Sequence, residues 1–519
     1  MDAASNTVAP ILGKVSRQAA VVFLTRGAAL VLGITSTILL SRLLGPGGLG
    51  EFRLGSVLVQ LVTAFCVLGL DKALLRYLPV LEARGEKGRG LLVAGSSVVF
   101  IISLALSAVL LLTAPIIATS YFHSPAMTNV IRLFSLQVPV LALFRFLSGA
   151  VTAAKRFDFA SKVTNILSPA VFVLLLALLA LVWPNLKGAI VARIVAQLAA
   201  SCFLAVFVVQ YYSKLRQTAP ATQGIFRNYL LLSMPLFVIG IGYQLLNQMD
   251  TIMLGHFVSP KEVGIYSVAF KVSAFVLIGL EILLPIVAPL FAQFRATSDN
   301  QSMETLFTAV TKWLCYSSLV IFAGIAVFRV ELLHVFGKGF TAGSSVLLIL
   351  AVGQLVNAAT GPTGVLLTMT GKQRWELANI VSMVAFNFLL NLLLIPKMGM
   401  TGAALAAALS IATINGLKIV QVYMLFGFRA YNLKYFKGLT AIGAAGLVGY
   451  LLRGWLFSAG CSPYAIIGVG GPSVLIIAAA GCWLLGLDQE DKVALVGLRT
   501  RQQNISVVSS ENAVEASVS

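Results

Sequence analysis

Charged residues are scarce in this chain of 519 residues: they make up 11% of it, whereas 59% of the residues are hydrophobic. A soluble protein carries roughly a quarter charged residues, so this composition excludes the soluble classes. The mean hydropathy of +0.95 agrees. We therefore predict an all-α integral membrane protein, because lipid leaves the backbone of a spanning segment no partner outside its own helix.

Residues that usually carry catalysis or bind metals are also few. The five cysteines are scattered without CxxC spacing, and the three histidines form no HExxH motif and no paired cluster in the sequence. No Walker A motif is present, so a built-in ATPase is not supported. No connection between apolar runs is long enough for a soluble catalytic domain. We expect no catalytic residue, no metal site and no cofactor.

Acidic residues are half as frequent as basic ones, 18 against 37, and the formal net charge is +19. Nucleic-acid binding would be one reading of this excess, but the positive-inside rule explains it better. With the N-terminus in the cytoplasm, 23 Lys and Arg fall in the inner segments and nine in the outer ones. We predict a multi-pass protein of the plasma (inner) membrane with both termini cytoplasmic and no nucleic-acid partner.

Apolar runs long enough to cross a bilayer number about fourteen. The predicted spans are 19–43, 54–77, 91–118, 130–152, 160–183, 188–212, 229–253, 264–292, 306–329, 344–369, 376–396, 402–426, 435–457 and 464–486. The sequence thus divides into a cytoplasmic N-terminal segment (1–18), an N-lobe of six spans (19–212), a cytoplasmic linker (213–228), a C-lobe of six spans (229–426), two further spans (435–486) and a disordered cytoplasmic tail (488–519).

The two lobes carry an internal repeat at an offset of 214 residues. The repeated pairs are Thr37 and Thr251, Pro46 and Pro260, Gly50 and Gly264, Asn165 and Asn379, and Gly188 and Gly402. Duplication on this scale is typical of transporter halves. Because six spans per copy is an even number, both copies have the same orientation, and the repeat is parallel rather than inverted.

Basic residues remain inside the predicted spans, where a charge costs about 2.5–3.5 kcal/mol on insertion scales. They are Arg26, Arg145, Arg193, Lys271 and Lys418. Such residues normally face a polar cavity or a partner, although those near an interface can also extend towards the headgroups. We assign Asp250 and Glu281 as the acids that compete for them. The excess of buried bases indicates an anionic substrate.

Several stretches of sequence resemble those of a transporter family. Arg42-Leu43-Leu44-Gly45-Pro46 followed by Gly50-Glu51-Phe52 resembles the R-x-L-G-P-x-x-x-G-x-(F/Y) turn after the first helix of polysaccharide flippases. Its counterpart after the seventh helix is similar to residues 250–255 and 263–266, and further matches are residues 366–372, 395–396 and 399–404, with Asn387 and Asn391. The resemblance covers about residues 10–460. It points to the O-antigen and polysaccharide flippases (Wzx type) of the multidrug/oligosaccharidyl-lipid/polysaccharide exporter superfamily.

The resemblance implies two six-helix lobes around a central cavity, with two added C-terminal helices. It also implies that a polyprenyl-(pyro)phosphate-linked oligosaccharide is moved from the inner to the outer leaflet by alternating access, for polysaccharide or lipopolysaccharide biosynthesis alongside glycan polymerase or ligase machinery. Arg26, Arg145, Arg193, Lys271 and Lys418 are then the candidate substrate-binding residues. Asp250 and Glu281 are the candidates for coupling to H⁺ or Na⁺.

Three other functions stay open at this point. One is a non-transporting scaffold for glycan assembly, for which the intramembrane charges would be an unexplained cost. A cation-coupled multidrug antiporter of the same superfamily would carry cationic substrates, which a basic cavity repels. A membrane glycan polymerase or glycosyltransferase would need a sizeable loop with catalytic side chains, and none is visible.

Overall fold

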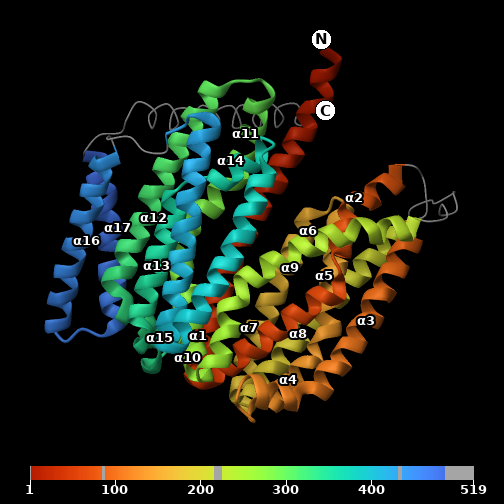
Figure 1. The fold of residues 1–519 in the computed structure, drawn as a ribbon, viewed down its shortest axis with the longest axis horizontal. Helices are drawn as coiled ribbons and strands as arrows, with labels where there is room; N and C mark the ends of the chain where they lie inside the picture. Colours follow the sequence, from red (N-terminus) through yellow and green to blue (C-terminus); the bar gives the residue numbers. More distant parts are fainter. Residues whose placement is uncertain (1, 84–87, 215–224, 430–434, 485–519) are drawn as a thin grey trace, which may run out of the picture. The chain divides into compact units, whose positions relative to one another are not determined.

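The computed structural model describes residues 2–83, 88–214, 225–429 and 435–484, and within this part of the chain there are helices and connections but no strand (Figure 1). The prediction of an all-α fold is confirmed. Most of the predicted linker 213–228 and the predicted tail 488–519 lie outside the described residues.

The helices follow one another along the chain in the order of their labels in Figure 1. In the first half they are α1 (Asp2–Val67), α2 (Leu70–Ala83), α3 (Gly88–Ile116), α4 (Met127–Ser135), α5 (Gln137–Ala153), α6 (Phe157–Lys162), α7 (Ser168–Val182) and α8 (Leu186–Lys214). In the second half they are α9 (Ile225–Phe257), α10 (Pro260–Ser273), α11 (Ile278–Ala296), α12 (Asn300–Phe336), α13 (Ser344–Ala359), α14 (Thr363–Met369), α15 (Gln373–Phe426), α16 (Tyr435–Ser458) and α17 (Pro463–Leu484). Single π turns extend α3 (Ile117–Tyr121) and precede α7 (Val163–Leu167), and 3₁₀ turns follow α10 (Ala274–Leu277) and precede α13 (Lys338–Gly343).

Nine helices of the described residues are long and apolar enough to cross a membrane, or up to eleven if each of two bent pairs is one span. The two longest, Leu24–Leu81 and Gln373–Phe426, hold 58 and 54 residues, far more than the about 20 that one crossing needs. Gly45 (φ 65°) and Gly399 (φ 56°) break them, because an α-helix cannot continue through a positive φ. The chain is therefore a multi-pass membrane protein. The count of fourteen spans stays a prediction.

The chain forms two compact units. The first consists of Met1–Val272, Leu333–Leu347 and Ile380–Ala407, and the second of Ser273–Leu332, Leu348–Asn379 and Ala408–Ser519. The first unit thus combines all of the predicted N-lobe with parts of the predicted C-lobe. The division into lobes at 19–212 and 229–426 stays a prediction.

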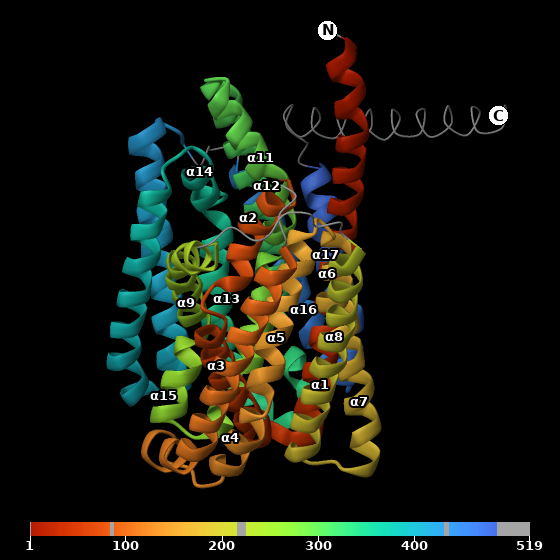
Figure 2. The same cartoon turned by 90° about the vertical axis from the view of Figure 1, so that its right-hand side faces the viewer.

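In the first unit, α5 packs against α2, α3 and α8, while α4 lies across the ends of α3 and α8 (Figures 1 and 2). Small residues permit these close approaches. A Cβ atom at Gly149 of α5 would lie 2.7 Å from the carbonyl oxygen of Asp71 in α2, and one at Gly95 of α3 would lie 2.7 Å from the Phe146 ring of α5. Membrane helices associate closely where small residues let their backbones meet.

The repeated turns of the two sequence copies contact each other inside the first unit. A Cβ atom at Gly50 would lie 1.7 Å from the carbonyl oxygen of Pro260, and one at Gly264 would lie 2.0 Å from that of Pro46. Each copy thus places its glycine against the proline carbonyl of the other copy. The offset of 214 residues found in the sequence therefore corresponds to a symmetric contact between the backbones of the two copies.

In the second unit, α16 and α17 lie side by side and pack on α12 (Figure 1). Phe328 of α12 forms a buried apolar cluster with Leu456, Ile466 and Val474. Next to this cluster, Arg453 of α16 makes two contacts of 2.8 Å with Oε1 of the buried Glu331. Apolar packing and a charged pair thus attach the last two helices to the unit.

Candidate functional site

Three cations of the first unit lie within electrostatic range of one another: Arg53, Arg193 and Lys271, which we call the basic triad. Arg53 lies on the second helix of α1, which begins just after Gly45, Arg193 on α8 and Lys271 on α10. All three side chains are half-buried. The sequence predicted Arg193 and Lys271, and the structure brings them together with Arg53.

Each cation of the basic triad has a neutral partner. Arg53 donates a hydrogen bond of 3.0 Å from Nη2 to Oε1 of Gln248. The Arg193 guanidinium lies 5.0 Å from the centre of the Phe172 ring. Lys271 Nζ donates to the carbonyl oxygen of Gly33 and to the hydroxyl of Thr37, both in α1.

The basic triad therefore concentrates positive charge without compensation. Within the described residues, none of its members lies within 4.0 Å of a carboxylate. Neutral hydrogen bonds lower the cost of burying a cation but do not cancel its charge. Three like charges in a poorly solvated region repel one another, and a bound anion relieves that repulsion. Such an arrangement is chemically suited to holding an anion.

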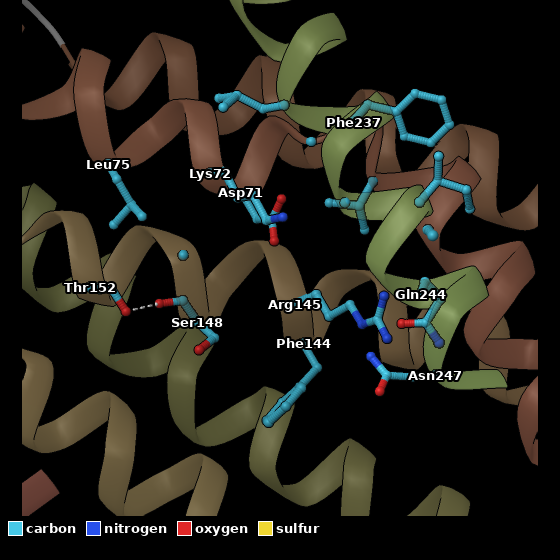
Figure 3. Close-up of a pocket in the computed structure, with 17 residues that line it drawn as sticks. Asp71, Lys72, Leu75, Phe144, Arg145, Ser148, Thr152, Phe237, Gln244 and Asn247 are labelled. Atoms are coloured by element: carbon cyan, nitrogen blue, oxygen red, sulfur yellow. Dashed lines mark hydrogen bonds between the residues drawn. The ribbon is translucent and has the colours of Figure 1, made fainter. Parts of the chain in front are cut away.

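Arg53 of the basic triad lies near the start of the second helix of α1. A cavity of about 470 Å³ lies at the C-terminal end of the same helix (Figure 3). Its wall includes Val67, 14 residues from Arg53, which is about 21 Å along a helix. Helices α2, α5 and α9 supply the rest of the wall. The break between α1 and α2 shapes it, because Leu68 and Gly69 both have positive φ and a Cβ atom at Gly69 would lie 2.7 Å from the backbone of α9.

Charged and amide side chains point into this cavity. In Figure 3, Arg145 of α5 extends towards Gln244 and Asn247 of α9, and Asp71 and Lys72 of α2 lie nearby. Asp71 is close enough to Arg145 to interact with its charge. With two cations and one carboxylate, the cavity has a net positive charge and hydrogen-bond donors suited to phosphate or sugar oxygens.

Asp250, near the end of α9, is surrounded by neutral donors. Tyr266 donates to its Oδ2 at 2.9 Å, Asn391 donates to its Oδ1 at 2.7 Å, and Asn387 also hydrogen-bonds to the carboxylate. Asn391 also donates to Oδ1 of Asn387 at 3.0 Å, and its own buried Oδ1 has no hydrogen-bond partner among the described residues. The carboxylate of Asp250 can take a proton, and it is an oxygen ligand of the kind that a hard cation such as Na⁺ prefers, once the ion replaces one of these N–H donors.

Lys418, another of the predicted cations, lies in the second unit and has a charged partner. Its Nζ lies 2.7 Å from Oε1 of Glu376, and the two side chains are 15% and 16% exposed. One helical turn further along each part of α15, Asn379 and Gln421 exchange two hydrogen bonds of 2.7 and 2.8 Å. Lys418 is thus neutralised within a polar layer between the two parts of α15.

The remaining predicted residues do not join these groups. Arg26, on the first part of α1, and Glu281, on α11, both have exposed side chains. The assignment of Asp250 and Glu281 as the acids that compete for the buried bases was wrong in one respect, since Asp71 and Glu376 are the carboxylates that interact with Arg145 and Lys418.

The chain is similar to known proteins in both sequence and structure. A family model described as "Polysaccharide biosynthesis protein" matches residues 39–342, which is more than half of the chain. The chain belongs to this polysaccharide biosynthesis protein family. A curated relative, "Probable low-salt glycan biosynthesis flippase Agl15" of Haloferax volcanii, is 28% identical over 224 residues, which cover 42% of this chain and 45% of the relative. The chain spans less than half the length of the curated relatives that it matches.

Solved transporters share the fold of this polysaccharide biosynthesis protein. "Lipid II flippase MurJ, inward closed conformation" superposes with a TM-score of 0.65 and 13% identity, covering 89% of this chain and 98% of that chain. A multidrug resistance MATE family transporter of the MOP superfamily, in an inward-facing conformation, gives a TM-score of 0.62 and 15% identity, covering 77% of this chain and 94% of the other. The chain thus shares its helical fold with these transporters, as predicted.

In this polysaccharide biosynthesis protein, Arg53 is the site residue that the sequence missed. The hydropathy of residues 45–53 is low, so the second span was predicted to begin at 54 and Arg53 was assigned to an outer segment. The helix in fact resumes directly after Gly45. Pro46 was the available signal, because proline is favoured at the first position of a helix.

Proposed function

We propose that this protein is a flippase that moves a polyprenyl-(pyro)phosphate-linked oligosaccharide from the inner to the outer leaflet of the membrane for polysaccharide or lipopolysaccharide-type biosynthesis. The observation that carries the proposal is the basic triad, three half-buried cations whose partners are all neutral. A (pyro)phosphate supplies the missing negative charge. The family match and the flippase names of the curated relatives support the same substrate class.

Two positions along the second helix of α1 can hold the anionic part of the substrate in turn. The cavity around Arg145 and Lys72 lies at one end of this helix, and the basic triad lies near its other end. Arginine binds phosphate through two parallel N–H donors, whereas lysine acts as a point charge. We infer that alternating access passes the (pyro)phosphate from the cavity to the basic triad while the polyprenyl chain stays in lipid.

The direction of transport in this proposal rests on the orientation of the chain. The excess of Lys and Arg in alternate connections favours both termini in the cytoplasm. We place the protein in the plasma membrane as part of the same proposal. The cavity then faces the cytoplasmic half of the membrane and the basic triad faces the outer half. Glycan polymerase or ligase machinery would consume the lipid-linked product on the outer side.

The experiment that tests the proposal uses purified protein in liposomes that contain a fluorescent polyprenyl-pyrophosphate disaccharide, with access from the opposite leaflet as the readout. We expect Lys271→Ala and Arg53→Ala to slow flipping about 100-fold, because each removes an anion-binding charge. Lys261→Ala is the matched control, since Lys261 lies on the same helix and is exposed. Equal flipping by Lys271→Ala and Lys261→Ala would overturn the proposal.

A cation-coupled multidrug antiporter is the second candidate, because the fold is shared with MATE transporters and Asp250 offers a carboxylate to a cation. The same liposomes distinguish the two. Uptake of a cationic dye that survives Lys271→Ala, without any flipping of the lipid-linked disaccharide, would favour the antiporter. The repulsion between the basic triad and a cationic drug argues against it.

Asp250 is our candidate for coupling to H⁺ or Na⁺. If flipping is stimulated by a Na⁺ or proton gradient, Asp250→Asn removes the stimulation, because the amide has no negative charge to offer the ion. Glu281→Gln is the comparison, since Glu281 is exposed on α11. Loss of stimulation in Glu281→Gln alone would move the coupling role to Glu281.

A further inference from the structure

Two of the three histidines of the chain meet in the first unit. His123 follows the π turn that extends α3, and His256 is the last residue but one of α9. Their ring centres are 5.2 Å apart and their planes are inclined at 47°, although 133 positions separate them in the sequence. Neither residue belongs to the basic triad or to the cavity around Arg145.

The backbone holds this pair in place. Phe122 is 4% exposed and packs against Gly255 so closely that a Cβ atom there would lie 2.7 Å from its ring. His123, next in the chain, has a φ of 51°. A positive φ in a residue other than glycine is uncommon and persists only where the surroundings impose it. The packing of Phe122 therefore fixes the loop that presents His123 to His256.

A hydrogen bond orients the His256 ring. Its Nδ1 lies 2.7 Å from the carbonyl oxygen of Tyr121, and the Tyr121 ring lies 4.8 Å from the imidazole. A carbonyl oxygen can only accept a hydrogen bond, so Nδ1 carries the hydrogen and Nε2 of the neutral ring keeps its lone pair. Metal-binding histidines are commonly oriented in this way, by donating their other N–H to a backbone carbonyl.

The surrounding helices favour a positive charge at this point. The π turn at the end of α3 finishes at Tyr121, and α9 finishes at Phe257. The C-terminal end of a helix carries a partial negative charge from its free carbonyl groups. Two such ends meet beside the two imidazoles, and His123 is exposed to incoming ions.

The separation of the rings matches that of two imidazoles on one metal ion. With a Zn–N bond of about 2.0–2.1 Å along the axis of the ring, the metal lies about 3.2 Å from each ring centre, and a tetrahedral angle of about 109° places the two centres about 5.2 Å apart. The observed distance between His123 and His256 is 5.2 Å.

We propose that His123 and His256 bind one divalent transition-metal ion, such as Zn²⁺ or Ni²⁺, with water completing the coordination. Imidazole nitrogen suits these ions and not Mg²⁺ or Ca²⁺. The described residues hold no group of three or more His, Cys, Asp and Glu side chains for a metal, so the site has two protein ligands and is weaker than a closed zinc site. A bound ion ties the end of α3 to the end of α9.

The test measures Zn²⁺ and Ni²⁺ binding to the purified full-length protein by calorimetry after removal of any affinity tag, with Mg²⁺ as the control ion. We expect one saturable Zn²⁺ site in the unmodified protein, at least about tenfold weaker binding in His123→Ala and in His256→Ala, and unchanged binding in His334→Ala. His123 is exposed, so His123→Ala is not expected to unfold the protein; His123→Cys restores a zinc ligand and part of the affinity.

Three results would overturn the proposal. The first is the absence of saturable Zn²⁺ binding in the unmodified protein. The second is binding by His123→Ala that equals that of the unmodified protein. The third is an equal loss in His334→Ala, which would place the metal elsewhere. A rise in the melting temperature with Zn²⁺ that disappears in His123→Ala supports the tie between the two helices.

Discussion

The two units of the protein treat buried cations in opposite ways. In the first unit, the hydrogen-bond partners of Lys271 among the described residues are a carbonyl and a hydroxyl, both neutral. In the second unit, Lys418 lies 2.7 Å from the carboxylate of Glu376. Both are lysines in apolar helices, and both were predicted as substrate-binding residues from the same signal.

The chemical nature of the partner, neutral or anionic, distinguishes cations that can bind a ligand from cations that stabilise the fold. A buried ion pair is already neutral, and a substrate anion gains little by approaching it. A cation with neutral partners keeps its full attraction for an anion. The acids show the same contrast, since Asp250 accepts hydrogen bonds from neutral side chains whereas Glu376 faces Lys418. The first unit is therefore the part of the protein that we expect to bind ions.

The largest effect is expected when the paired charge of the second unit loses its partner. Glu376→Ala leaves the half-buried Lys418 without a counter-charge; breaking a fully buried pair costs about 3–5 kcal/mol of the free energy of unfolding, and we expect a loss that approaches the lower end of this range. Unfolding in mixed detergent with increasing dodecyl sulfate measures it. The double variant Glu376→Ala with Lys418→Met removes both charges and should regain most of the loss. If the single and double variants unfold alike, Glu376 is not the partner that stabilises Lys418.

The second effect comes from giving the basic triad the carboxylate that it lacks. Gln248 Oε1 accepts a hydrogen bond from Arg53 at 3.0 Å, so Gln248→Glu places a negative charge there with little change of shape. We expect flipping to slow about 10- to 100-fold, because the new carboxylate competes with the substrate phosphate. Gln293→Glu, on the exposed face of α11, is the control. Undiminished flipping by Gln248→Glu would argue that the basic triad does not bind the anion.

The sequence predicted the helices and the internal repeat far better than it predicted these pairings. Apolar runs identify spans because each run must bury its own backbone, and Gly50 and Gly264 were found as repeat partners before the structure showed their contact. Hydropathy does not show which side chains meet. Asp71 and Glu376 lay within predicted spans, but only the packing of α2 on α5 and the fold of α15 on itself make them partners of Arg145 and Lys418.

The histidine pair shows the same limit. His123 and His256 have no motif spacing, since they meet through the end of α3 and the end of α9 rather than along one helix. Arg53 was missed for a different reason. The low hydropathy of residues 45–53 suggested a long connection between two spans, whereas the helix is interrupted at Gly45. Local signals thus locate helices, whereas the sites depend on contacts between residues far apart in the sequence.

A smaller effect is expected when the charge of the basic triad is kept and its geometry is changed. Arg53→Lys retains a cation but loses the planar fork that binds two phosphate oxygens at once. We expect flipping to fall about 3- to 10-fold, much less than in Arg53→Ala. The fluorescent liposome assay measures both variants side by side. Equal losses in the two would mean that the fork, and not the charge, is what the substrate requires.

The smallest effect, and the most direct test of the comparison, is the same substitution in both units. Lys271→Met removes one of three repelling cations at the expense of two neutral hydrogen bonds, so the free energy of unfolding should change by less than about 1 kcal/mol in either direction. Lys418→Met instead leaves the half-buried Glu376 without its cation and should cost several times more. Melting temperatures in detergent measure both. If Lys271→Met proves as destabilising as Lys418→Met, then Lys271 stabilises the fold as Lys418 does, and its charge does not serve to bind a substrate.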